Sequence, residues 1–257
     1  MSAAVRWGGW ITGPTAIGPE EFARAGYQYV GIDTQHGYFD DAGAARLLRR
    51  LSGVPITTLV RLPSADPAPI GRVLDAGADG VIIALVESAE QAADAVAAAC
   101  YPPTGVRSFG PLRADLGTDL ATLATRTSVY VMIETVRGVQ AAAEICAVPG
   151  LAGVYVGPAD LAISMGVAVA DGLTDTRVLG AIDDIQALAT AAGITPGIHA
   201  GTGAAGRMLA ARGYTMLTLA AESQALRRGA AEFLAEAAGT EPSQTATGQT
   251  KPAGGYQ

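Results

Sequence analysis

Lysine is almost absent from this chain of 257 residues. The one lysine, Lys251, stands in the terminal sequence GTEPSQTATGQTKPAGGYQ, and all other permanently positive side chains are arginines. Imine chemistry needs a desolvated lysine amine as the nucleophile. The sequence therefore argues against imine-forming aldolases and against enzymes that hold pyridoxal phosphate on a lysine.

Cysteine, positive charge and long apolar runs are scarce too. Cys100 and Cys146 stand in separate alanine-rich segments, so we expect reduced thiols rather than a disulfide framework. A net charge of −7, with no basic cluster beyond Arg49-Arg50 and Arg227-Arg228, argues against a nucleic-acid or anionic-membrane surface. No apolar run reaches the ~18 residues of a membrane span, and the sequence begins without a signal-peptide pattern. We expect a soluble, cytoplasmic protein that acts on small molecules.

Short apolar segments alternate with amphipathic ones along the chain, as strands alternate with helices. Eight predicted strands share this pattern: residues 7–12, 27–33, 57–62, 80–86, 129–134, 153–157, 195–200 and 215–220. Hydrophobic residues make up 49% of the chain, enough for one large core. A doubly wound open sheet also alternates, but eight units with polar residues at many strand ends favour closure. We therefore predict an α/β fold, a single (β/α)8 TIM barrel over residues 1–238.

Three segments stand apart from this regular pattern. Residues 239–257 are rich in Gly, Pro, Thr, Ser and Gln, which predicts a flexible C-terminal tail. Residues 101–118 form a long irregular insertion after the fourth unit, and such loops are often functional. The last helical pattern, SQALRRGAAEFLAEAA, carries an apolar stripe and could close the barrel as an ordinary eighth helix.

Ionisable side chains follow the predicted strands at the end where a barrel carries its active site. They are Asp33, His36, Arg61, Glu134, Asp160 and His199. Each alone could be a helix cap, a surface ion pair or a structural hydrogen-bonding group. Their convergence on one face of the predicted barrel favours an active site.

Four segments carry a resemblance to a known family. They are IDTQHGYFD, LVRLPSADPAPIGRVLDAGADGVIIALVESAEQA, YPPTGVRSFGP and MIETVRGVQAAAEICAVPGLAGVYVGPADLAISMG. In order and spacing they resemble the HpcH/HpaI family of metal-dependent aldolases, relatives of the citrate lyase β-subunit and the 2-keto-3-deoxy acid aldolases. The similarity runs from about Trp7 to about Ala238. It implies a class II aldolase that reversibly cleaves a 4-hydroxy-2-oxo acid into pyruvate, or a close 2-oxo acid, and an aldehyde.

The resemblance also implies a metal site and an acid/base residue. Glu134 of the IET motif and Asp160 of GPADL would hold a divalent ion, Mg²⁺ or Mn²⁺, with Co²⁺ as a further option. Two carboxylates plus waters suit such a hard ion. His36 would move protons, and Asp75 of VLDAG would orient it. Asp75 could instead pair with Arg72 or with Arg61.

A second group of residues would bind the substrate. It comprises Arg61, Ala159, Asp160, Asp33, Trp10 and His199. The family pattern implies that Arg61 donates to the keto oxygen as negative charge develops there, which makes it a catalytic residue as well. The amides of Ala159 and Asp160 at a helix start would meet the substrate carboxylate. Asp33 would be a polar partner close to His36.

Three features depart from the family pattern, and one of them is the pair Tyr38 and Phe39, which would add an aromatic wall after His36. Many members have a proline in the segment where this chain reads Ala84 and Leu85. His199 stands where an aliphatic residue is expected to shape the aldehyde-acceptor side. An imidazole there could select a polar or anionic acceptor, supply a second acid/base group, or form a structural hydrogen bond with a loop carbonyl.

Other functions would use the same residues. Decarboxylation of oxaloacetate and a citrate-type condensation proceed through the same kind of enolate. From a different class, a barrel that only binds a metal and an oxo acid would act as a sensor or scaffold. The resemblance further implies a homo-oligomer, a trimer or hexamer, in which the C-terminal helix is exchanged between subunits.

Overall fold

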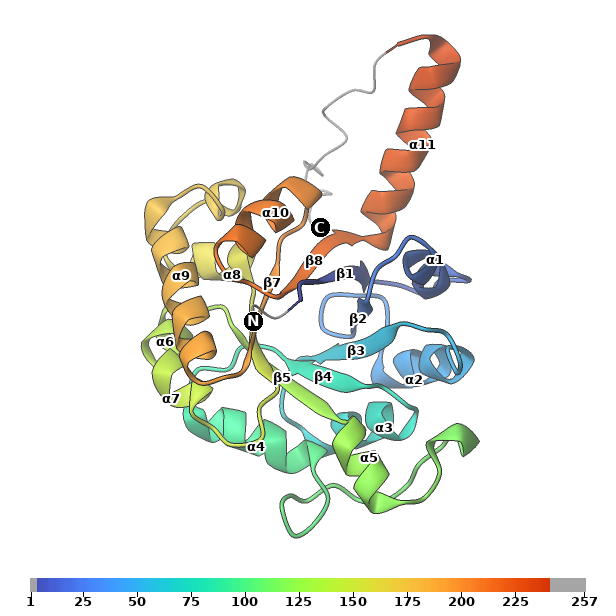
Figure 1. Cartoon of the computed structure of the whole chain (residues 1–257), viewed down its shortest axis with the longest axis vertical. Helices are drawn as coiled ribbons and strands as arrows, with labels where there is room; N and C mark the ends of the chain where they lie inside the picture. Colours follow the sequence, from blue (N-terminus) through green and yellow to red (C-terminus); the bar gives the residue numbers. More distant parts are fainter. Residues whose placement is uncertain (1–3, 241–257) are drawn as a thin grey trace, which may run out of the picture.

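The computed structural model describes residues 4–240, which form a closed barrel of eight parallel strands (Figure 1). The strands are β1 (Arg6–Ile11), β2 (Tyr29–Asp33), β3 (Thr57–Leu62), β4 (Gly80–Ile83), β5 (Ser128–Ile133), β6 (Gly153–Val156), β7 (Thr195–His199) and β8 (Met216–Ala221). Each strand pairs with its neighbours in sequence, and β1 also pairs with β8. The predicted (β/α)8 barrel is confirmed.

Helices connect successive strands around the outside of the barrel (Figure 1). They are α1 (Gly18–Arg24), α2 (Asp41–Arg50), α3 (Pro67–Asp75), α4 (Ala89–Ala99), α5 (Leu120–Arg126), α6 (Val136–Gln140), α7 (Ala142–Cys146), α8 (Pro158–Ser164), α9 (Thr176–Ala191), α10 (Gly203–Ala211) and α11 (Glu222–Ala238), with 3-10 helices η1 (Ala114–Leu116) and η2 (Val169–Asp171). Serine, threonine or aspartate side chains cap several of them, such as Thr202 at the start of α10.

Along each strand, side chains point in turn into the barrel interior and outward to the surrounding helices. On β3, Leu59 packs among the interior side chains, whereas Val60 and Leu62 pack in the layer between strands and helices. Both faces of the strands are therefore buried, which explains why they read as continuous apolar runs. Inside the barrel the hydroxyls of Tyr29 and Tyr155 share hydrogen bonds with Thr218, at 2.8 and 2.6 Å.

The strand β4 is shorter than its apolar run predicted. The run extends to Val86, but the strand ends at Ile83. Two residues later Leu85 adopts the left-handed conformation with φ of 53°, which is rare for a residue with a branched side chain. The chain turns there, so the Leu85 amide leaves the ladder and donates to Oε1 of Glu134 at 2.9 Å.

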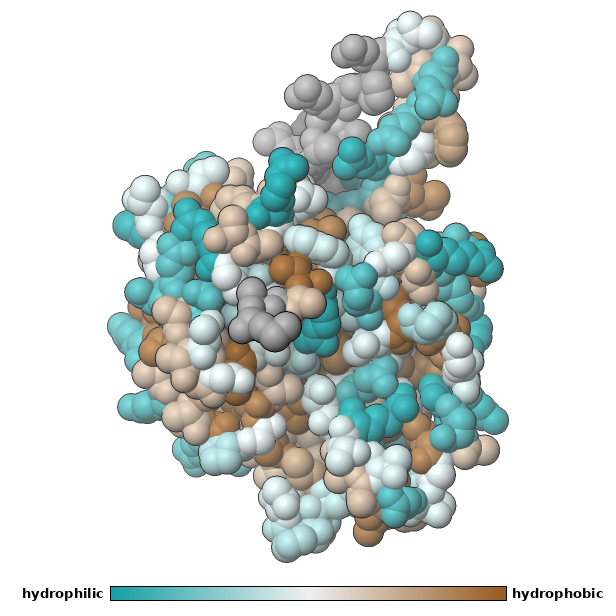
Figure 2. All heavy atoms as spheres, viewed as in Figure 1, coloured by the Kyte–Doolittle hydropathy of each residue, from teal (hydrophilic) through white to brown (hydrophobic). Residues whose placement is uncertain are grey.

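The last helix, α11, projects away from the barrel rather than covering it (Figure 1). Leu226, Phe233 and Leu234 on this helix are 73%, 74% and 72% exposed, and apolar spheres are visible along it in Figure 2. The interpretation of an ordinary eighth helix that closes the barrel is therefore wrong, while exchange between subunits stays a prediction. The helix ends at Ala238, and beyond Thr240 the predicted tail lies outside the described residues.

The insertion over residues 101–118 follows α4, so it lies at the N-terminal ends of the strands. Its position is fixed by a hydrogen bond from the amide of Leu112 to the carbonyl of Asp75, the last residue of α3. Active sites of barrels lie at the opposite end. The expectation that this loop is functional therefore finds no support at the barrel's cavity.

Two further expectations concern the cysteines and the membrane. Cys100 and Cys146 are unpaired thiols, as the sequence predicts, and burial raises the pKa of Cys146 to about 11. Within residues 4–240, every helix is too short or too polar to cross a bilayer.

Candidate active site

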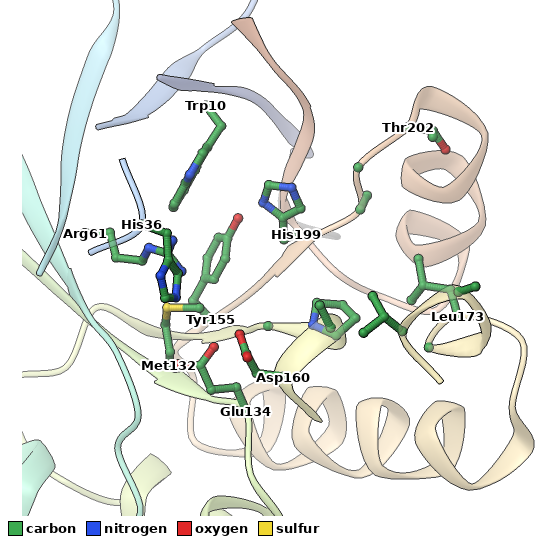
Figure 3. A pocket seen from close by; sticks show the side chains of 18 of the residues that line it. Trp10, His36, Arg61, Met132, Glu134, Tyr155, Asp160, Leu173, His199 and Thr202 are labelled. Carbon is green, nitrogen blue, oxygen red and sulfur yellow. The ribbon is translucent and has the colours of Figure 1, made fainter. Parts of the chain in front are cut away.

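A cavity of about 550 Å³ opens at the C-terminal ends of the strands (Figure 3). Strands β1, β3, β5, β6 and β7, the loops that follow β2, β5, β6 and β7, and the start of α11 supply its lining. Of the predicted site residues, it is lined by Trp10, His36, Arg61, Glu134, Ala159, Asp160 and His199. The carboxyl groups of Asp33 and Asp75 do not line it.

Asp33 reaches the site through Arg61 rather than by lining the cavity. The two residues are paired in register on β2 and β3, so their side chains meet inside the barrel. Arg61 donates from Nε to Oδ1 of Asp33 at 2.9 Å and from Nη2 to Oδ2 at 2.5 Å. Nε1 of Trp10 donates to the same carboxylate at 3.2 Å. Asp33 thus fixes both an arginine and an indole that face the cavity.

The electrostatics of this buried group favour an ionised Asp33. Burial on its own raises the pKa of the carboxyl, but hydrogen bonds and charge from Arg61 outweigh burial and hold the pKa below its usual value. The guanidinium carbon also lies 5.3 Å from the centre of the Trp10 ring. These contacts fix the orientation of the Arg61 guanidinium.

A tight loop after β2 presents His36 at the mouth of the cavity. Oδ1 of Asp33 accepts the backbone N–H groups of Gln35 at 3.0 Å and of His36 at 3.1 Å. A Cβ atom at Gly37 would lie 2.2 Å from the carbonyl oxygen of Asp33 and 2.6 Å from that of Thr12, so the turn requires glycine. The loop holds the backbone of His36 firmly and leaves its imidazole exposed.

Asp75 is not close to His36 within one chain. It ends α3, and because that helix runs antiparallel to the strands, Asp75 lies at the N-terminal end of the barrel. Its Oδ1 accepts from Nη2 of Arg107 at 2.8 Å, so its partner is neither Arg61 nor Arg72. Within one chain Asp75 therefore does not orient His36, because motif spacing does not reveal which end of the barrel a residue occupies; a role of Asp75 toward His36 of another copy stays a prediction.

Glu134 follows β5 as a buried carboxylate with one oxygen left free. It is 1% exposed, and Oε1 accepts the amide of Leu85, whereas Oε2 is buried without a hydrogen-bond partner. Burial raises the pKa of Glu134 to about 6; the Leu85 amide opposes the rise and the charge of Asp160 adds to it. A Cβ atom at Gly157 would lie 2.3 Å from Oε2, so this glycine leaves room for the carboxylate.

Glu134 and Asp160 together fit a divalent cation. A cation between them would satisfy the unpaired Oε2 and relieve the repulsion between two carboxylates. Residues 4–240 contain no cluster of three or more His, Cys, Asp or Glu side chains that could hold a metal. Waters or substrate oxygens would therefore complete the coordination, as Mg²⁺ and Mn²⁺ allow.

Ala159 and Asp160 stand in the first turn of α8. Their amides have no partner within the helix, because the first intrahelical bond runs from the amide of Leu161 to the carbonyl of Gly157. Both residues line the cavity. The amides are thus free of intrahelical partners, and their contact with a substrate carboxylate stays a prediction.

Some lining residues were not predicted. Tyr155 forms the floor and stacks on Trp10, with ring centroids 6.0 Å apart and planes at 23°. Its place on β6 follows from the alternation of inward-facing residues, which could have revealed it. Thr202 and Gln224 line the outer part, and Leu85 acts through its backbone. No sequence signal marks a leucine that adopts a left-handed conformation.

Comparison with known proteins agrees with this arrangement. The family model described as HpcH/HpaI aldolase/citrate lyase matches residues 6–228. A hydroxypyruvate/pyruvate aldolase of Rhizorhabdus wittichii is 35% identical over 232 residues, covering 89% of this chain and 92% of that protein. A 4-hydroxy-2-oxo-heptane-1,7-dioate aldolase of Salmonella paratyphi A is 32% identical over 238 residues, covering 90% and 89%. The crystal structure of an HpcH/HpaI aldolase/citrate lyase family protein from Burkholderia cenocepacia J2315 superposes with a TM-score of 0.82 at 31% identity, covering 91% and 95%.

Proposed function

This chain belongs to the HpcH/HpaI aldolase/citrate lyase family, and from that premise we propose a metal-dependent aldolase, a carbon–carbon lyase. It reversibly cleaves a 4-hydroxy-2-oxo acid into pyruvate, or a close 2-oxo acid, and an aldehyde. One observation supports this proposal more strongly than the others. The unpartnered Oε2 of Glu134 lies beside Asp160 in a cavity that also holds Arg61, and the described barrel contains no lysine.

The proposed cofactor is a divalent ion held by Glu134 and Asp160, Mg²⁺ or Mn²⁺, with Co²⁺ as a further option. When bound, such an ion supplies a Lewis acid at the keto oxygen of the 2-oxo acid. The remaining chemistry belongs to side chains of the chain itself.

The 2-oxo acid is positioned by groups on two sides of the cavity. Its carboxylate meets the amides of Ala159 and Asp160, and its keto oxygen faces the guanidinium of Arg61. Nε and one N–H of Nη2 are committed to Asp33, so the rest of the guanidinium is left for the substrate. Negative charge that develops on the keto oxygen during enolate formation is stabilised by this fixed positive group.

His36 moves the proton in cleavage. Directly or through a water, its imidazole takes the proton of the C4 hydroxyl, and the C3–C4 bond breaks. The aldehyde leaves with its new carbonyl, the bonding electrons form the enolate of the 2-oxo acid, and C3 is then reprotonated. A histidine at the exposed mouth of the cavity is suited to exchange this proton with solvent.

Replacing His36 by asparagine is expected to lower the rate of aldol cleavage about 10²-fold, the lower end of the range for a general base. The loss stays at that end because His36 is exposed and water can partly replace it. The measurement is the steady-state release of pyruvate from a 4-hydroxy-2-oxo acid in the presence of Mn²⁺. Tyr38→Phe, in the same loop and 89% exposed, is the matched control. Equal rates for the His36 variant and the wild type would remove His36 from the mechanism.

A related reaction of the same enolate is the alternative function. The family description also names citrate lyase, so decarboxylation of oxaloacetate or a citrate-type condensation would use the same metal site. Product analysis by NMR separates these reactions, with Mn²⁺ and either pyruvate plus a set of aldehydes, oxaloacetate alone, or oxaloacetate plus acetyl-CoA. An aldol adduct from pyruvate supports the proposed aldolase. Decarboxylation or citrate formation without any adduct replaces it by the alternative.

The proposed partners are a 2-oxo acid, an aldehyde and further copies of this chain. Helix α11 projects with Leu226, Phe233 and Leu234 exposed, and these side chains gain buried area by packing on a second copy. We expect a trimer or hexamer in light scattering, and a smaller species for the double variant Phe233→Glu, Leu234→Glu. Glu236→Lys on the same helix is the control. A monomeric wild type contradicts the proposal.

A cytoplasmic location is proposed as well, supported by the unpaired thiols and open to test by cell fractionation.

A further inference from the structure

His199 is an unusual residue for the inner wall of this cavity. It is the last residue of β7 and lies beside Trp10, with the two rings perpendicular at 89° and their centroids 5.5 Å apart (Figure 3). Trp10 is fixed in turn by its hydrogen bond to Asp33. The imidazole is therefore held in place by packing on a rigid indole.

Packing leaves the polar atoms of His199 unused. No donor or acceptor in residues 4–240 forms a hydrogen bond with its ring nitrogens, and the loop carbonyl that a structural role would require is not found there. Burial lowers the pKa of His199 to about 4, and the positive charge of Arg61 adds to the effect. Near neutral pH the ring is uncharged, with one N–H donor and one acceptor nitrogen.

An aliphatic side chain would fill this space as well but would present no hydrogen-bonding group to the cavity. His199 is half-buried, and its ring nitrogens face the open space of the cavity without a partner in the described residues. The ring nitrogens of His199 border the cavity, so a bound ligand is the partner that the site can offer. A neutral donor and acceptor matches a neutral hydroxyl group rather than a carboxylate or a phosphate.

The placement of the substrate identifies which hydroxyl this is. In the proposed function, the carboxylate and keto oxygen of the 2-oxo acid are directed to Ala159, Asp160 and Arg61. The third carbon then points to the remaining deep wall of the cavity, which Trp10 and His199 form above Tyr155 (Figure 3). A substituent on that carbon meets the imidazole before it meets the outer residues of the cavity.

We propose that His199 is a specificity-determining residue that hydrogen-bonds a hydroxyl group on C3 of the donor, so that the chain prefers a 3-hydroxy-2-oxo acid to pyruvate. This inference rests on the proposed aldolase function and deepens it. The hydroxyl group donates to one ring nitrogen or accepts from the other, and no proton is transferred. Pyruvate leaves the imidazole without a partner and is therefore the weaker donor.

The test compares two donors with one aldehyde. For the wild type, His199→Leu and His199→Gln, kcat/KM is measured for hydroxypyruvate and for pyruvate, with propanal as acceptor and Mn²⁺ present. His199→Leu keeps the volume and removes the hydrogen bond, so the preference for hydroxypyruvate is expected to fall about tenfold, as expected for one hydrogen bond. His199→Gln keeps a neutral donor and acceptor and is expected to retain most of the preference. His199→Met replaces the leucine variant if that one fails to fold.

The outcomes separate this inference from the function on which it rests. An unchanged donor preference in His199→Leu, or an equal loss for both donors, assigns His199 a packing role and overturns the inference while the aldolase remains. A wild-type protein that exchanges C3 protons of neither donor in the presence of metal overturns the proposed function, and the inference with it.

Discussion

Glu134→Gln is expected to lose metal-dependent turnover, with a fall in kcat/KM of about 10³-fold or more. The metal contributes several kcal/mol to stabilisation of the transition state, and each ~1.4 kcal/mol corresponds to a factor of ten in rate. Glutamine keeps the shape and still accepts the Leu85 amide through its carbonyl, but it replaces the free Oε2 with a neutral donor group. Turnover and Mn²⁺ binding by calorimetry are measured together, because both are expected to disappear.

Stability distinguishes a metal ligand from a structural residue at this position. In the metal-free protein the pKa of Glu134 rises from 4.5 to about 6, so the folded state loses stability as the pH rises through this window and stays weaker above it. Metal-free Glu134→Gln is therefore expected to melt at or above the wild-type temperature at pH 8. Glu90→Gln on the exposed face of α4 is the control. A variant with wild-type turnover, or with intact Mn²⁺ binding, would contradict the assignment of Glu134 as a ligand.

Arg61→Lys is expected to reduce kcat/KM about 10³-fold, although the positive charge is kept. Removal of one donor to a developing oxyanion lowers the rate about 10²–10³-fold. The ammonium group of lysine cannot replace the planar guanidinium, which presents several N–H donors in a fixed arrangement. Arg61 donates two hydrogen bonds to Asp33 and faces the substrate with its remaining N–H groups. A lysine cannot do both, so the substrate contact is lost or misplaced.

A metal-binding measurement shows that such a loss comes from substrate stabilisation. Arg61 is not among the proposed ligands, so Mn²⁺ affinity is expected to remain close to that of the wild type. Arg177→Lys is the matched control, since Arg177 pairs with Asp175 on the surface and does not line the cavity. A fully active Arg61→Lys enzyme would show that a point charge is sufficient for catalysis. It would contradict the proposed role of the planar guanidinium.

Much of the fold and part of the site follow from the sequence for physical reasons. Strands buried on both faces must read as apolar runs, so the eight strands and the barrel could be predicted. The ends of parallel strands meet at one face, so the predicted convergence of Arg61, Glu134, Asp160 and His199 also follows from topology. The short motifs IET and GPADL mark two of these ends, where polar residues interrupt an apolar strand.

The features that the sequence did not reveal depend on tertiary contacts. Asp75 lies in a helix, and only the fold shows that this helix ends at the far side of the barrel, beside Arg107. The departure of α11 from the barrel leaves no mark in its amphipathic pattern, because an apolar stripe fits a barrel wall and another subunit equally well. The turn at Leu85 is set by the contact of its amide with Glu134 rather than by its own backbone preference.

Solvent deuterium exchange into pyruvate, followed by NMR, tests the central claim most directly. The protein is incubated in D₂O with pyruvate and Mg²⁺, Mn²⁺ or Co²⁺, and a parallel sample contains EDTA. We expect loss of the methyl proton signal with at least one of the metals and no loss with EDTA, because enolate formation requires the site of Glu134 and Asp160. Absence of exchange with every metal would contradict a metal-dependent pyruvate aldolase and would favour a barrel that only binds its ligands.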